Sequence, residues 1–173
     1  EIGKIAIQRG IPTIISYFSR EIVQSILKEH GSAKVVTATN VFAHIDGINE
    51  IVECILELLD QDGVFITECH YLGALVDTLQ YDTIYHEHLM YYSLHSLKHL
   101  LEKHGLEIFH AKEIPTHGGS IRAFVSRKGK YPIKPSVAGI LDHEEEIGLA
   151  GEKLLDFKST VVASKLELHS MLL

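Results

Sequence analysis

Short apolar strands alternate with amphipathic helices from the first residues to Glu68, and this alternation constrains the fold more than any other feature. The apolar runs are short and rich in β-branched side chains, as expected of strands. Between them, apolar residues recur at the spacing of one helix face. The expected elements are strands over 11–17, 34–39 and 64–68, helices over 2–9, 21–30 and 48–59, and a turn at 61–63. Such an order is typical of a parallel sheet covered by helices.

The pattern changes after Glu68, where residues 70–92 show no clean period and are rich in Tyr and His. A segment of that length without regular structure is either functional or wrongly assigned. The elements expected beyond it are a helix over 94–104, an antiparallel hairpin of strands over 106–114 and 120–127, a basic link over 128–135 and helices over 144–173. Parallel strands that finish in an antiparallel hairpin resemble the end of a Rossmann-like class I methyltransferase sheet, although other doubly wound α/β folds finish similarly.

The composition fits a folded domain, because 46% of the 173 residues are hydrophobic and 23% are charged. That balance excludes a disordered tail or a low-complexity linker. Lys and Arg number 16 against 23 Asp and Glu, so the net charge is −7. A general nucleic-acid binder is therefore disfavoured, since phosphates need a basic face. Small phosphorylated ligands are still allowed, because backbone amides and a cation or two can hold them.

The cysteine count and the hydropathy favour a cytoplasmic location. Cys54 and Cys69 are too few for a disulfide framework, and reduced thiols are favoured over a bridge between them. No apolar run approaches the ~20 residues of a membrane span, and nothing at the start resembles a signal peptide. We expect a cytoplasmic protein without membrane or nucleic-acid partners. The chain starts at Glu1 rather than Met and its last helical pattern has no cap, so we expect a piece of something longer.

Twelve histidines stand out, because histidine is the side chain that titrates near neutral pH. The densest cluster is Tyr85, His86, Glu87 and His88, inside the irregular segment. In an extended chain His86 and His88 would share one face, whereas in a tight turn they would not. Three interpretations compete: a solvated loop, a metal site of His-x-His with a carboxylate, and a general base that removes a carbon-bound proton.

Asn40 and His44 follow directly on the strand expected over 34–39. In open α/β sheets the ligand crevice lies beyond the carboxyl ends of the strands. Both residues are therefore placed where a cofactor or a substrate would be met. The alternative is that Asn40 simply caps the next turn.

Four blocks of sequence together carry a family resemblance. They are Asn40-Val41-Phe42-Ala43-His44-Ile45, Ile66-Thr67-Glu68, Tyr81 to His88, and Pro115 to Arg122. In order and spacing they resemble the S-adenosylmethionine-dependent sugar C-methyltransferases, which methylate a ring carbon of nucleotide-linked keto-deoxysugars. The resemblance implies a partial class I methyltransferase domain over 1–130, truncated on its N-terminal side. A linker and the start of a C-terminal helical or α/β region would occupy 131–173.

The resemblance also assigns catalytic roles. His88 matches the family's proposed base, Glu87 and Tyr85 match its neighbours, and His44 matches a second active-site histidine. Chemistry agrees with the choice of base, because a neutral imidazole is available near neutral pH whereas a carboxylate would need a raised pKa. Glu87 either orients the imidazole or binds a sugar hydroxyl.

Substrate and cofactor contacts follow in the same way. The candidates for substrate binding are His117, Gly118, Gly119 and His86. The glycines would let the backbone approach the ligand closely, while the alternative is a plain hairpin turn with an exposed histidine. Asn40 and Phe18 are the candidates beside the methionine moiety and the adenine of S-adenosylmethionine.

The chain departs from the family in what it lacks. It has neither the glycine-rich turn nor the acidic residue that hold the cofactor, and it has no zinc module. We therefore expect zinc only in an N-terminal module outside this chain, no metal site within it, and an isolated piece that is inactive and does not fold alone. The alternatives are a metal-binding or non-catalytic α/β module that uses His86 and His88, a docking fragment, or a methyltransferase for another small-molecule acceptor.

Overall fold

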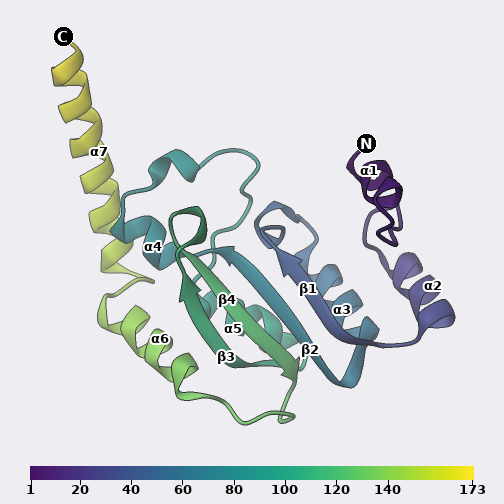
Figure 1. Cartoon of the computed structure of the whole chain (residues 1–173). Coiled ribbons are helices and arrows are strands. Elements are labelled where there is room, and N and C mark those ends of the chain that lie inside the picture. The colour runs from purple at the N-terminus through teal and green to yellow at the C-terminus, as the bar shows by residue number, and fades with distance from the viewer.

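A computed structural model describes all 173 residues as an α/β structure (Figure 1). Its helices are α1 (Ile2–Gln8), α2 (Arg20–His30), α3 (Ile48–Leu58), α4 (Leu72–Asp77), α5 (Leu94–Lys103), α6 (Pro135–Glu146) and α7 (Glu152–Leu172). Its strands are β1 (Ala33–Thr39), β2 (Leu59–His70), β3 (Leu106–Ile114) and β4 (Ser120–Arg127). Short 3-10 turns occupy Phe42–His44, Tyr81–Thr83 and Thr116–Gly118.

The four strands form one sheet in the order β1-β2-β4-β3. β1 and β2 run parallel, with Ala38 opposite Thr67, and β4 runs antiparallel to both β2 and β3. β1 and β2 therefore end at the same edge of the sheet at which the turn between β3 and β4 lies. The expected change from parallel strands to an antiparallel hairpin is confirmed.

The main core lies between one face of the sheet and the helices α3 and α5, which sit behind the strands in Figure 1. Val52 of α3 and Leu101 of α5 are fully buried against Phe65 of β2. Such residues recur at helical spacing, which is why both helices could be read from the sequence. Val137 belongs to the same core, so α6 also packs on the sheet, beside β3.

The structure corrects two expectations about the N-terminal half of the chain. Residues 11–17 form no strand, and Ile14 and Ile15 are more than half exposed. A β-branched run forms a strand only where a pleated, half-buried surface receives it, and this segment has no partner strand. The expected turn at 61–63 lies inside β2, where the register to β1 shifts. There Gly63 is required, because a Cβ would lie 2.8 Å from the Ala33 carbonyl oxygen.

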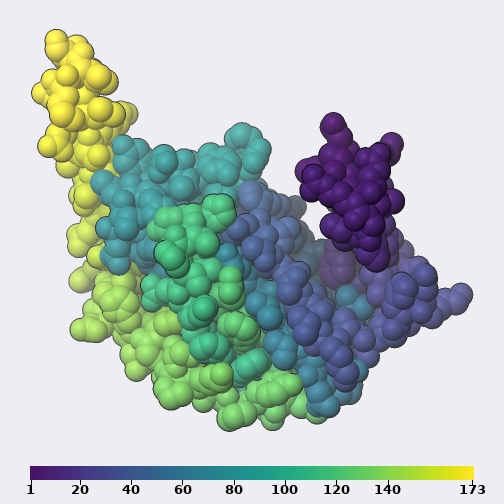
Figure 2. Space-filling model, viewed as in Figure 1, coloured from purple at the N-terminus to yellow at the C-terminus, as the bar shows by residue number.

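The C-terminal helices also differ from expectation. The first of them begins at Pro135 rather than at residue 144, because proline is favoured in the first turn of a helix. The first turns of α7 lie against α4, where Lys153 pairs with Asp77, and its C-terminal part extends away from the rest of the structure (Figure 2). None of its residues is buried. None of the helices is both long and apolar enough to cross a membrane.

The segment from residue 71 to 93 is held at both of its ends above the edge of the sheet. The Tyr71 amide donates to the Gly119 carbonyl at 3.1 Å, and the Leu72 amide donates to the Tyr92 carbonyl at 2.9 Å. A capping box of Ser93 and Ser96 then starts α5. A segment expected to be irregular is thus a loop with the short helix α4, anchored beside the turn between β3 and β4.

Candidate active site

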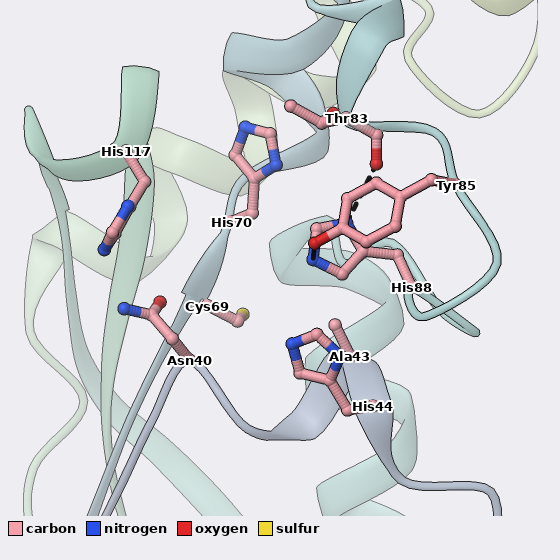
Figure 3. A pocket seen from close by; sticks show the side chains of 9 residues that line it. All are labelled: Asn40, Ala43, His44, Cys69, His70, Thr83, Tyr85, His88 and His117. Atoms are coloured by element: carbon pink, nitrogen blue, oxygen red, sulfur yellow. Dashed lines mark hydrogen bonds between the residues drawn. The ribbon is translucent and has the colours of Figure 1, made fainter.

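A cavity of about 390 Å³ lies where β1 and β2 end and the β3–β4 hairpin turns (Figure 3). Its lining comes from four separate parts of the chain: the residues after β1, the end of β2, the segment 71–93 and the hairpin. The lining residues are Asn40, Ala43, His44, Cys69, His70, Thr83, Tyr85, His88 and His117. The structure thus brings together five of the residues expected at the site, namely Asn40, His44, Tyr85, His88 and His117.

Tyr85 and His88 face each other because the chain turns tightly between them. The His88 amide donates to the Tyr85 carbonyl at 3.0 Å, and the two ring centroids are 4.4 Å apart. This turn replaces the extended arrangement in which His86 and His88 would share a face. His86 is exposed and does not line the cavity.

The hydrogen bonds of His88 determine which ring nitrogen carries the proton. Its Nδ1 lies 2.9 Å from the Thr83 carbonyl oxygen, which can only accept, so Nδ1–H is the donor. Nε2 of the neutral ring is then an acceptor, and the Tyr85 hydroxyl, 3.2 Å away, donates to it. The result is an imidazole with a fixed orientation and an unprotonated nitrogen on the side of Tyr85.

His44 is oriented by the backbone of the same turn. Its Nδ1 donates to the Glu87 carbonyl at 2.9 Å, and its ring centroid lies 4.9 Å from that of His88. The Leu89 amide donates to the Ala43 carbonyl at 2.8 Å, which ties the two segments together. Glu87 contributes through its backbone, while its side chain is exposed. Its expected catalytic carboxylate is therefore not among the groups that line the cavity.

Two lining residues at the end of β2 were missed by the sequence reasoning. Burial raises the pKa of the Cys69 thiol to about 12, so Cys69 contributes a neutral thiol to the cavity wall. His70 donates through Nε2 to Oε1 of Gln80 at 3.1 Å, and burial lowers the pKa of its imidazole. The rule that selected Asn40, proximity to the carboxyl end of a strand, would also have found His70.

The hairpin turn that carries His117 packs against the segment 71–93. His117, Gly118 and Gly119 all have positive φ angles, of 50°, 76° and 123°. A Cβ on Gly118 would overlap the Gln80 side chain, and one on Gly119 would overlap Ala74. The two glycines therefore have a packing reason in the protein itself, independent of any ligand.

An ion pair between the buried Glu68 and the partly exposed Arg122 holds the hairpin against β2. Glu68 faces Arg122 across the β2–β4 register and accepts from its Nε at 2.9 Å and from its terminal nitrogen at 2.6 Å. Thr116 donates to the other carboxylate oxygen at 3.2 Å. These contacts hold the turn with His117 close to the end of β2.

The two cofactor candidates lie in different places. Asn40 has a left-handed backbone with φ 52°, and its backbone N–H donates to the Glu68 carbonyl at 2.8 Å. Its side chain lines the cavity. Phe18 lines a separate apolar cavity of about 330 Å³, whose wall includes Phe42 and Ile45. Asn40 and Phe18 therefore line two different cavities, which share no lining residue.

No group of three His, Cys, Asp or Glu side chains is arranged to hold a metal ion. His86 and His88 are separated by the turn and have no third ligand. The structure therefore gives no support to the alternative in which these two histidines hold zinc.

Comparison with known proteins agrees with this architecture. Residues 6–111 match a methyltransferase domain, and residues 115–173 match a C-methyltransferase C-terminal domain. The C-methyltransferase NovU of Streptomyces niveus is 39% identical over 150 residues, which cover 86% of this chain and 36% of that protein. The chain thus spans about a third of the length of this relative.

A solved structure supports the fold. The S-adenosylmethionine-dependent methyltransferase of Clostridium acetobutylicum superposes with a TM-score of 0.51 at 14% identity, covering 73% of this chain and 69% of that one. The expected methyltransferase-like α/β fold is therefore confirmed. With more than half of its residues matched to that domain, the chain belongs to the methyltransferase domain family.

Proposed function

We propose that the protein to which this chain belongs is an S-adenosylmethionine-dependent C-methyltransferase that acts on a ring carbon of a nucleotide-linked keto-deoxysugar. The observation that carries the proposal is the Tyr85–His88 pair, with its oriented, unprotonated Nε2 beside the cavity. The match to a C-methyltransferase C-terminal domain supports carbon as the methylated atom. The proposal that the substrate is a nucleotide-linked sugar rests on the four sequence blocks that resemble the sugar C-methyltransferases.

Methylation at carbon requires a carbanion equivalent, which a base forms by removing a hydrogen α to a ketone. In the proposal Nε2 of His88 takes this proton, and the resulting imidazolium keeps its Nδ1–H on the Thr83 carbonyl. Tyr85 is the donor nearest to the base, so its hydroxyl turns from Nε2 to the ketone oxygen, where negative charge develops. The Nδ1–H of His44 donates to the Glu87 carbonyl, and the His44 ring packs on the His88 ring and keeps it in place.

S-adenosylmethionine supplies an electrophilic methyl group on a sulfonium when it is bound. This chain would contribute the Asn40 amide beside the methionine moiety and the Phe18 ring beside the adenine. His117, whose side chain lines the cavity from the side opposite Tyr85, would bind the sugar or its phosphates. Gly118 and Gly119 would present backbone there, whereas the exposed His86, which does not line the cavity, has no part in the proposal.

The test compares two histidines of the same turn in the full-length protein, assayed with S-adenosylmethionine and a 4-keto nucleotide sugar. His88→Asn retains a side-chain N–H for the Thr83 carbonyl but removes the basic nitrogen, so methyl transfer should fall about 10²–10⁴-fold while cofactor affinity is kept. His86→Asn is the matched control and should stay near the wild-type rate. An inactive His86→Asn beside a normal His88→Asn would reject the assignment, as would a wild-type protein that methylates no keto sugar.

A further inference from the structure

His70 is the one histidine of the cavity to which the proposed mechanism gives no role. It is the last residue of β2, and its ring stands between the hairpin turn with His117 and the pair formed by Tyr85 and His88 (Figure 3). A side chain in that position meets whatever occupies the cavity.

The proton positions of His70 follow from the side chain of Gln80. The Gln80 amide nitrogen lies 2.8 Å from the Gly118 carbonyl oxygen, and only the nitrogen end of an amide can donate to a carbonyl. Oε1 of Gln80 therefore faces His70, and Nε2 of His70, 3.1 Å away, must carry the hydrogen. Nδ1 of the neutral ring is left as an acceptor, and no group of the protein hydrogen-bonds to it.

The surroundings keep this ring neutral. Burial lowers the pKa of His70, and the neighbouring His88 and His117 lower it further, whereas Gln80 and Asp82 act in the opposite direction. His70 and His88 thus use different ring nitrogens as hydrogen-bond acceptors: Nδ1 in His70 and Nε2 in His88. Water reaches Nδ1 while the cavity is empty, because this atom is not among the buried polar atoms without a partner. A ligand that displaces this water must supply a hydrogen-bond donor, or the acceptor is left unpaired at a cost in binding free energy.

We propose that His70 is a substrate-binding residue that accepts, through Nδ1, a hydrogen bond from a hydroxyl group of the methyl acceptor. The proposal rests on the proposed function and deepens it, because it adds a requirement on the acceptor: a hydroxyl within reach of β2 while the reacting carbon faces His88. His70 thereby selects between acceptors that carry this hydroxyl and deoxy analogues that lack it.

A purely structural role is the competing explanation, since His70 also steadies Gln80 and through it the Gly118 carbonyl. The two roles differ in what they do to selectivity. Loss of a structural brace weakens binding of every acceptor alike, whereas loss of the Nδ1 acceptor weakens only acceptors that carry the hydroxyl.

The experiment measures dissociation constants by calorimetry, and kcat and KM for methyl transfer, with full-length protein. The probes are a 4-keto nucleotide sugar and the set of its analogues in which one ring hydroxyl at a time is replaced by hydrogen. The wild type should bind one of these analogues about 10- to 100-fold more weakly than it binds the parent sugar. In His70→Phe, which keeps a ring of similar size, that difference should vanish, with KM raised and kcat nearly unchanged. His70→Asn should restore part of it, because its carbonyl oxygen can stand near the position of Nδ1.

Two results would overturn the inference. In one, His70→Phe weakens the binding of the parent sugar and of every analogue by the same factor. In the other, His70→Phe leaves the dissociation constants of the parent sugar and of the analogues unchanged. The proposed function fails separately, because wild-type protein that binds these sugars but transfers no methyl group rejects the reaction while leaving the binding ratio measurable. Wild-type protein that binds none of them rejects both.

Discussion

The hydroxyl oxygen of Tyr85 lies 3.2 Å from Nε2 of His88, so the proposed base is already hydrogen-bonded within the protein. The pairing arises from the turn that the His88 amide closes on the Tyr85 carbonyl. In the proposed mechanism Tyr85 has two successive roles. Its hydroxyl would hold the ring of the base before substrate binds, and it would then be the nearest donor to the ketone oxygen as negative charge develops there.

Replacing Tyr85 by Phe should therefore slow the reaction without removing the base. We expect kcat for methyl transfer to fall about 10²–10³-fold, as for the loss of one oxyanion donor, with cofactor affinity unchanged. Steady-state kinetics of the full-length protein measure this. Equal kcat values for Tyr85→Phe and wild type would show that the hydroxyl takes no part in the reaction.

His44 should matter through the position of His88. Its ring packs 4.9 Å from that of His88, and it is tied to the backbone of Glu87. His44→Ala should lower kcat about 10- to 100-fold, because a small misplacement of a catalytic group is costly. His99→Ala, an exposed histidine on α5, is the control and should be silent.

Asn40→Ala should act on the cofactor instead and weaken S-adenosylmethionine binding, as measured by calorimetry. If Asn40→Ala leaves both cofactor affinity and methyl transfer unchanged, the carboxyl end of β1 is not part of the site.

The stability of the methyltransferase region should depend on Glu144 of α6. Its buried carboxylate accepts from the Leu94 amide at 2.6 Å and from the His95 amide at 3.0 Å, so it caps α5 from outside. Glu144→Ala leaves these amides unpaired and should lower the free energy of unfolding by about 1–3 kcal/mol. The neighbouring Glu145, whose side chain is 73% exposed, is the matched control and should change it by no more than about 0.5 kcal/mol. Urea midpoints test the pair, and equal midpoints for both variants contradict the capping role.

The regular elements could be predicted because their signals are local. Val52 and Ile55 lie on the buried stripe of α3, and the alternation of Ile121, Ala123 and Val125 identifies the buried face of β4. The strand predicted over 11–17 was wrong because β-branched residues only favour a strand, and a strand forms only where a partner strand pairs with it.

The candidate site could be predicted only in part, because its geometry comes from one tight turn and from packing. A tight turn between Tyr85 and His88 was one of two open arrangements, and the sequence could not choose between them. Gln80 links His70 to the Gly118 carbonyl of the hairpin, which is distant in sequence, and local patterns do not encode such a contact. The buried cap from Glu144 to α5 likewise spans residues far apart in the chain.

His70 should titrate below the ordinary histidine range, since burial lowers the pKa of its imidazole from 6.5. A lowered pKa in the folded state means that the unfolded chain takes up this proton first, so the contribution of His70 to stability falls as the pH drops through the unfolded pKa. NMR of the ring C–H resonances measures the pKa directly. Gln80→Glu places a carboxylate at Nε2 and should raise the pKa. A His70 that titrates above 6.5 in the wild type would contradict the assignment of a neutral acceptor.

The central claim is that Nε2 of His88 removes the proton from the carbon that becomes methylated. Exchange of the α-hydrogen of a 4-keto nucleotide sugar with deuterated water tests this most directly, because it reports deprotonation without requiring methyl transfer. Full-length wild-type protein and His86→Asn should both catalyse the exchange, whereas His88→Asn should lose it about 10²–10⁴-fold while S-adenosylmethionine still binds. Exchange at the wild-type rate in His88→Asn would show that another group is the base.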